Sequence, residues 1–203
     1  MPDKRGRPPK TAELQDTKQM LIEATIKLVK QYGADSITIR NVCEEARLSI
    51  GTFYHHFQNK DDLMMYFVRE ASFDNFILNT PLSDIAGRVC ELYMHLINRY
   101  LMLGDEFMKS FYTTGNKALS AYMGQTDDGF AEGTVMARCE QELSAAQRQG
   151  YWKQGADPHT ASMDLCTIVK GCVFEWALDD GRIDIEKTLR RIVYAYFAGI
   201  SER

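Results

Sequence analysis

The apolar residues of this 203-residue chain recur with the three- and four-residue spacing of amphipathic α-helices. An early stripe runs through Leu21, Ala24, Leu28 and Tyr32, and Gly33 is placed to end that helix. The same spacing returns in several long segments further along the chain. No segment alternates apolar and polar residues as a half-buried strand would. The pattern therefore predicts an all-α protein.

Two short helices joined by a tight turn are expected between residues 38 and 57. Thr38 is a favourable N-cap for the first helix and Ser49 for the second. In the second helix, Ile50, Phe53 and Phe57 are expected to share an apolar face. The opposite face would present the small, hydroxyl and imidazole groups of Gly51, Thr52, Tyr54 and His55. Such a helix suits a DNA groove, although a plain helical hairpin with an exposed Tyr and His has the same periodicity.

A further helix is expected to begin at Lys60 and to run to about Asn79, ahead of Pro81. Asn59 can cap it, with Asp62 reaching back as in a capping box. A cation such as Lys60 in the first turn is unfavourable for the helix dipole unless an anion lies nearby. A DNA phosphate would supply that anion, and a solvated lysine is the alternative.

The rest of the chain is also expected to be mostly helical. A short apolar segment covers residues 107–112, and residues 113–129 are interpreted as a partly helical loop. Gly150 is expected to end the helix that follows this loop. Further helix starts are expected at Ser83, Phe130, Asp157-Pro158 and Asp184.

Residues 17–63 resemble the DNA-binding domain of the tetracycline-repressor (TetR) family of bacterial transcription regulators. The resemblance is carried by Ser36-Ile37-Thr38-Ile39-Arg40-Asn41-Val42 and by Ala46-x-Leu48-Ser49-x-Gly51-Thr52-Phe53-Tyr54-x-His56-Phe57-x-Asn59-Lys60. It implies a three-helix helix-turn-helix DNA-binding domain at residues 13–62. A helical domain for effector binding and dimerisation would follow at residues 63–203, and a disordered basic arm would precede at residues 1–12.

The resemblance also implies which side chains contact DNA. Arg40 would approach phosphate and a base edge, since arginine can form a bidentate pair with guanine. Ile50 departs from the polar residue usual in the family, and would offer only thymine-methyl or packing contacts. The implied contacts are Thr38, Arg40, Ser49, Gly51, Thr52, Tyr54, His55, His56 and Lys60.

The basic N-terminus offers a second nucleic-acid signal. Arg5-Gly6-Arg7-Pro8 resembles the core of an AT-hook, in which Arg5 and Arg7 would enter a narrow minor groove. A solubilising basic tail is the equally weighted alternative. The whole chain has a net charge of −4, and residues 1–62 carry ten Lys or Arg against nine Asp or Glu. DNA binding would therefore need placed contacts, and its affinity should fall steeply with salt.

The second half of the chain suggests an effector site and a dimer surface. Candidate pocket residues for an apolar or aromatic small molecule are Phe67, Tyr93, Phe107, Phe111, Met136, Cys139 and Trp176. The resemblance implies that the last two helices pair with those of a second subunit, with interface candidates Leu165, Val169, Val173, Leu189, Ile192 and Tyr196. In both sets, residues that only complete the chain's own core are the alternative.

These signals together predict a ligand-responsive transcriptional repressor that binds a palindromic operator as a homodimer. Effector binding would shift the helix after Asn59 and release the DNA. An effector-independent regulator, an activator or an architectural DNA-binding protein remains an alternative. We find no catalytic, cofactor or metal-binding motif, and five cysteines lack metal-like spacing. Reduced, buried thiols are expected, with a thiol sensor as the alternative. With no signal peptide or apolar span, we expect a cytoplasmic protein with no membrane partner.

Overall fold

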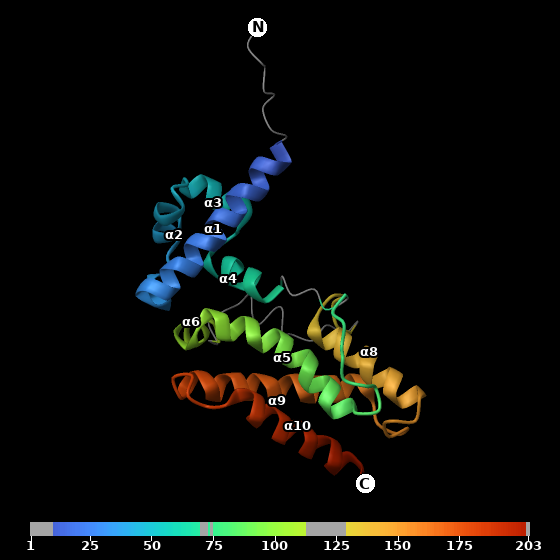
Figure 1. Ribbon diagram of the computed structural model, residues 1–203. Helices are drawn as coiled ribbons and strands as arrows, with labels where there is room; N and C mark the ends of the chain where they lie inside the picture. Colours follow the sequence, from blue (N-terminus) through green and yellow to red (C-terminus); the bar gives the residue numbers. More distant parts are fainter. Residues whose placement is uncertain (1–9, 70–72, 74, 113–128, 202–203) are drawn as a thin grey trace. The chain divides into compact units, whose positions relative to one another are not determined.

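The computed structural model describes residues 10–69, 73, 75–112 and 129–201 (Figure 1). The all-α class predicted from the sequence is confirmed. The chain divides into two compact units, and the boundary in the sequence falls between Met64 and Met65. Helix α4 (Lys60–Arg69) runs across this division. In the described part of the chain, no helix combines the length and the apolar character needed to cross a bilayer.

The first unit is built around one long helix. Its elements are α1 (Lys10–Tyr32), η1 (Ala34–Ser36), α2 (Ile39–Ala46), α3 (Ile50–His56) and the first residues of α4. Gly33 ends α1 as expected, with φ +80° and its N–H donating to the carbonyl of Val29. Tyr32 is 64% exposed and does not belong to the apolar stripe. The side chains at the centre of the unit are Leu21, Leu28, Ile37, Val42, Phe53, Phe57 and Leu63.

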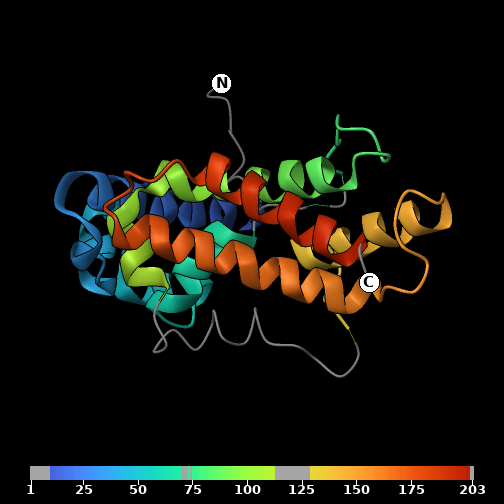
Figure 2. The same cartoon turned by 90° about the horizontal axis from the view of Figure 1, so that it is seen from below.

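The second unit is a helical bundle. Its described helices are α5 (Ile85–Leu103), α6 (Asp105–Phe111), α8 (Val135–Arg148), α9 (Pro158–Leu178) and α10 (Ile185–Ser201). Helix α5 packs on α8 and α10, and α9 packs on α6, α8 and α10. Figure 2 shows α9 (orange) and α10 (red) running side by side. The fully buried side chains of this bundle include Val89, Tyr93, Phe107, Phe111, Leu143, Leu165 and Leu189.

Several helix boundaries follow local signals in the sequence. Asp157 caps α9 by accepting from the N–H groups of His159 and Thr160, and Pro158 occupies the first helical position as expected. Other starts lie later than expected. Asp84, rather than Ser83, caps α5 by accepting from the N–H of Gly87.

The start of α8 and the end of α4 differ more from expectation. Helix α8 begins at Val135 and not near residue 130, because the hydroxyl of Thr134 accepts from the N–H of Ala137. Helix α4 ends at Arg69, ten residues before the expected end at Asn79. The expected loop at residues 113–129 lies almost entirely outside the described residues.

The described residues between 73 and 84 form a non-helical strap along α5. The carboxylate of Glu91 accepts from the backbone N–H groups of Asn79 and Thr80 at 2.8 Å each, and from the amide of Asn79 at 3.1 Å. The ring of His95 stacks on Phe76 with centroids 4.0 Å apart. The N–H groups of Asn79 and Thr80 therefore donate to a side chain of α5, and not to the backbone carbonyls that a longer α4 helix would offer.

Partial burial raises the pKa of Glu91, but the hydrogen bonds from Asn79 and Thr80 outweigh it and bring that pKa to about 2. A second carboxylate, Glu142 on α8, is buried and paired with Arg88 of α5 at 2.6 Å and with Arg138 at 2.9 Å. Removing one partner of such a pair leaves a buried charge, so the network fixes α5 against α8.

Candidate nucleic-acid interface

The two short helices of the first unit are shaped by side-chain caps and one left-handed residue. The hydroxyl of Thr38 accepts from the N–H of Asn41, and that of Ser49 from the N–H of Thr52 at 3.0 Å. Both predicted caps are thus confirmed. Between the helices, Arg47 adopts φ +55°, and the N–H of Leu48 donates to the carbonyl of Cys43. This closes α2 and turns the chain sharply into α3.

One side of α3 packs into the unit and the other faces outward. Phe53 and Phe57 are buried and hold the helix against the core. Tyr54 is 56% exposed, and its ring meets Phe53 edge to face at 5.6 Å. Ile50 was expected on the buried face but is 50% exposed, because the helix begins there and the core contacts start one turn later. The outward face consists of Ile50, Gly51, Tyr54 and His55.

Gly51 contributes no side chain to this outward face. A Cβ atom added there would meet only the hydroxyl oxygen of Ser49, at an ordinary contact distance of 3.6 Å. The unit therefore does not require glycine at this position for packing. The absence of a side chain matters only to something that approaches from outside.

Other expected contact residues are partly engaged within the unit. The hydroxyls of Ser49 and Thr52 lie 2.9 Å apart, and both residues belong to the cap of α3. Arg40 is exposed, with its Nε donating to Glu44 at 2.8 Å. A contact between Arg40 and DNA would share or replace this exposed ion pair, which costs little because exposed pairs contribute little.

His56 has a structural partner. Its Nε2 lies 2.8 Å from the hydroxyl of Thr17 on α1, so it helps to join α3 to α1. Partial burial lowers the pKa of His56, and the nearby charges of His55 and Lys18 lower it further. The ring is therefore neutral at pH 7.

Lys60 is the last expected contact residue that the structure describes. Lys60 is the first residue of α4 and is half-buried. The side chain of Asn59 accepts from the N–H of Asp62, so the expected cap forms. In a capping box the carboxylate of Asp62 would accept from the N–H of Asn59, but here it accepts from the N–H of Gln58. Arg5 and Arg7 lie outside the described residues.

The expected effector-pocket residues are all buried where their side chains are described. Tyr93, Phe107, Phe111, Met136, Cys139 and Trp176 belong to the core of the second unit, and the side chain of Phe67 lies outside the described residues. Trp176 donates to the carbonyl of Gly181 at 3.1 Å and so packs on the turn between α9 and α10.

Tyr93 is the most unusual member of this set. Its hydroxyl is buried without a hydrogen bond of ordinary geometry, beside the thiols of Cys139 and Cys166. Burial raises the pKa of Tyr93 well above its usual value, and raises that of Cys139 to about 12. All five cysteines are buried and free, and burial raises the pKa of each. They are thus protonated, which favours the structural interpretation over a thiol sensor.

Most of the expected dimer residues face the chain's own core. Leu165, Val169, Val173 and Leu189 are buried within the single chain, and so they cannot form the surface met by a second subunit. Ile192 and Tyr196 are half-buried. The periodicity of α9 and α10 correctly marked an apolar face, but α5, α6 and α8 cover it. The exposed residues of α9 are Thr160, Asp164, Thr167, Gly171, Phe174, Glu175 and Leu178.

A helix-turn-helix with an exposed, flat second helix, followed by a helical bundle, defines a class of DNA-binding regulators. Residues 21–66 match the family model described as "Bacterial regulatory proteins, tetR family". The chain belongs to the TetR family of helix-turn-helix transcriptional regulators. Members of this family are transcription factors and not enzymes.

Similarity to known proteins extends over most of the chain. The transcriptional regulator PksA of Bacillus subtilis is 21% identical, covering 95% of this chain and 93% of PksA. The nicotine-responsive transcriptional repressor HdnoR of Paenarthrobacter nicotinovorans is 25% identical, covering 81% of this chain and 85% of HdnoR. The structure of RolR in complex with resorcinol has a TM-score of 0.57 at 18% identity, covering 94% of this chain and 90% of RolR. This last likeness concerns the fold.

Proposed function

We propose that this regulator is a ligand-responsive repressor that binds a palindromic operator as a homodimer. The observation that carries the proposal is the outward face of α3, where Gly51, Tyr54 and His55 lie exposed above a buried Phe53. A short helix with a flat, hydrogen-bonding front can enter the major groove. Around it, Thr38, Arg40, Ser49, Thr52 and Lys60 would contact backbone or bases.

The proposed roles of three residues are refined by their surroundings. Ile50, being half-exposed on the same face, is assigned to a thymine methyl group. His56 is neutral and bonded to Thr17, so it positions α3 and at most donates one hydrogen bond to phosphate. Arg5 and Arg7 would enter the adjacent minor groove. The arm at residues 1–12 and the DNA-binding domain at residues 13–62 would then act together.

Homodimerisation is proposed through the outward side of α9, joined by the adjoining surface of α10. Phe174 and Leu178 are large apolar side chains exposed on one side of α9, and Gly171 lies one turn before Phe174. Glycine at that position would let a second α9 helix approach closely. A twofold dimer would place two α3 helices in successive major grooves about 34–36 Å apart, which requires a palindromic site.

Ligand response is proposed for the domain at residues 63–203. The buried aromatic side chains, with the hydroxyl of Tyr93 beside the thiols of Cys139 and Cys166, would supply an apolar site with one polar group. The name of HdnoR describes a related repressor as nicotine-responsive. The ligand must prefer the state that does not bind DNA, and a coupling of about 1–3 kcal/mol is typical of such switches.

A footprinting experiment tests the proposal. Purified protein is bound to the DNA upstream of its own gene, and protection is mapped with and without small aromatic compounds. We expect a sharp palindromic footprint that one class of compound removes. Diffuse protection of AT-rich DNA would instead support an architectural protein. A sharp footprint that no compound alters would support an effector-independent regulator.

A further inference from the structure

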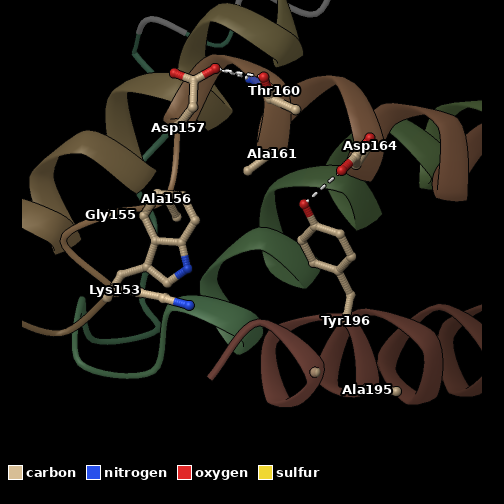
Figure 3. A pocket seen from close by; sticks show the side chains of 11 residues that line it. Lys153, Gly155, Ala156, Asp157, Thr160, Ala161, Asp164, Ala195 and Tyr196 are labelled. Atoms are coloured by element: carbon tan, nitrogen blue, oxygen red, sulfur yellow. Dashed lines mark hydrogen bonds between the residues drawn. The ribbon is translucent and has the colours of Figure 1, made fainter. Parts of the chain in front are cut away.

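Two hydrogen bonds between side chains of different helices differ in how their direction is set. In the second unit, the hydroxyl of Tyr196 on α10 donates to the carboxylate of Asp164 on α9 at 3.0 Å (Figure 3). That direction is fixed, because an ionised carboxylate only accepts. In the first unit, the hydroxyl of Thr17 on α1 lies 2.8 Å from Nε2 of His56 on α3. Both of these groups can donate or accept, so the position of the imidazole hydrogen decides the direction.

The second ring nitrogen of His56, Nδ1, is open to solvent. Among the described residues, the ring has no hydrogen bond other than the one with Thr17. Buried side-chain atoms without a partner occur in two of the described residues, and His56 is neither of them. Nδ1 therefore reaches the surface, on the helix that also presents Tyr54 and His55.

The surroundings of His56 favour a neutral ring in the free protein. Partial burial is the largest cause that lowers the pKa of His56, and the positive charges of His55 and Lys18 lower it further. Among the described groups of α1, α3 and α4, no carboxylate offsets these positive charges. A DNA phosphate beside Nδ1 would supply a negative charge and would raise the pKa of His56.

A neutral imidazole carries one N–H, so the bond with Thr17 determines what Nδ1 can do. The hydroxyl oxygen of Thr17 can accept a hydrogen bond whether or not its own hydrogen is donated elsewhere. If Nε2 carries the hydrogen and donates to Thr17, then Nδ1 of the neutral ring is an acceptor. A phosphate oxygen is an acceptor too, so the two repel each other until Nδ1 is protonated.

We propose that Thr17 is a positioning residue that makes the DNA contact of His56 depend on a proton. The hydroxyl oxygen of Thr17 accepts from Nε2–H, so Nδ1 can donate to a phosphate only after it takes up a proton from solvent. The charged ring then pairs with the phosphate. This inference rests on the proposed docking of α3 on DNA, and it adds a dependence of operator affinity on pH.

The direction of that dependence follows from proton linkage. Each bound DNA-binding domain takes up a proton where the free ring is neutral and the bound ring is charged. An opposite charge within about 4–6 Å raises such a pKa by about 1–3. Operator affinity should therefore rise by about tenfold per domain as the pH falls from about 8 to about 6, and should level off below the pKa of the free ring.

Imidazole ¹⁵N chemical shifts of the full chain, measured without DNA, test the bond with Thr17. The chain has four histidines, and the signals missing from His56→Gln assign His56. We expect a neutral ring with its hydrogen on Nε2, in the unaltered protein and in Thr17→Ser, which keeps the oxygen. Hydrogen on Nδ1 of the neutral ring would overturn the proposal.

Operator affinity as a function of pH tests the proton uptake. Fluorescence anisotropy at fixed salt measures binding to a labelled duplex that the unaltered protein has selected from a random pool. We expect the unaltered protein and Thr17→Ser to show the full rise. Thr17→Val and His56→Gln should lose most of it, since the first offers no acceptor to Nε2–H and the second has no ring to protonate. Urea unfolding of each variant checks that the folded protein is compared.

Failure of this inference differs from failure of the proposed docking. If Tyr54→Phe leaves operator affinity unchanged, the docking of α3 is wrong and the role of Thr17 falls with it. If Tyr54→Phe weakens binding while Thr17→Val or His56→Gln keeps the full pH dependence, the docking stands and the role of Thr17 is overturned. An unaltered protein whose affinity does not rise as the pH falls overturns it as well. Should Thr17→Val fail to fold, the comparison with His56→Gln and the ¹⁵N shifts still decide.

Discussion

Replacing Gly51 by alanine should affect stability and DNA binding in opposite directions. A Cβ atom at residue 51 meets nothing closer than the Ser49 hydroxyl at 3.6 Å, so the methyl group fits the folded protein. Glycine inside a helix costs about 0.5–1 kcal/mol relative to alanine. Gly51→Ala should therefore raise the free energy of unfolding by up to about that amount.

The same methyl group would stand on the surface that meets DNA. An extra methyl in a closely packed contact typically costs about 1–3 kcal/mol, which corresponds to roughly a 5- to 150-fold loss of operator affinity. Fluorescence anisotropy with labelled operator, at fixed salt, measures the loss, and thermal or urea unfolding measures the stability.

Gly199→Ala is the matched control. It adds a methyl to an exposed position near the end of α10, where a Cβ atom meets nothing within 4 Å. We expect Gly199→Ala to leave operator affinity unchanged. If Gly51→Ala binds operator as well as the unaltered protein does, DNA does not approach this part of α3 and the docking is wrong. A loss of stability in Gly51→Ala would contradict the packing argument.

Four further predictions concern single side chains. Tyr54→Phe should weaken operator binding by about 0.5–1.5 kcal/mol with unchanged unfolding, and equal affinity would show that the hydroxyl meets no phosphate. Arg40→Ala should relax preference at one base pair in a binding-site selection, whereas intact preference would restrict Arg40 to phosphate. Gly171→Arg should yield monomers in analytical ultracentrifugation, and a persisting dimer would move the interface elsewhere. Glu91→Gln should destabilise the second unit by about 1 kcal/mol after allowance for solvent screening, measured by urea unfolding at pH 7. The pKa of Glu91 in the folded protein is about 2, which is below its ordinary value of 4.5. The stabilisation from the Glu91 carboxylate is therefore complete at neutral pH and is lost as the pH falls from about 4.5 to 2. The unfolding free energy of Glu91→Gln should not show this loss.

Local chemistry is what made much of the first unit predictable. Thr38, Ser49 and Asn59 cap helices through bonds to residues three positions away, so the relevant information is contiguous in the sequence. Gly33 ends α1 for the same reason. The exposure of Ile50 was missed because periodicity does not show where along a short helix the core contacts begin.

Long-range contacts explain the errors in the second unit. The sequence pattern after Lys60 predicted a helix as far as Asn79. It could not show that Glu91 and His95, far along the chain, bind the strap in a non-helical form. The apolar stripe of a helix also does not show whether it packs against its own chain or against a second subunit. Leu165 and Leu189 are buried against other helices of their own chain.

Site-specific photo-crosslinking tests the central claim most directly. A benzophenone amino acid replaces Tyr54, and the protein is irradiated with DNA selected from a random pool by the unaltered protein. The same substitution at Tyr151, an exposed tyrosine of the second unit, is the control. We predict a covalent adduct from position 54 within a palindromic half-site and none from position 151. Equal crosslinking from both positions, or none from position 54 to DNA that remains bound, would contradict the proposed role of α3.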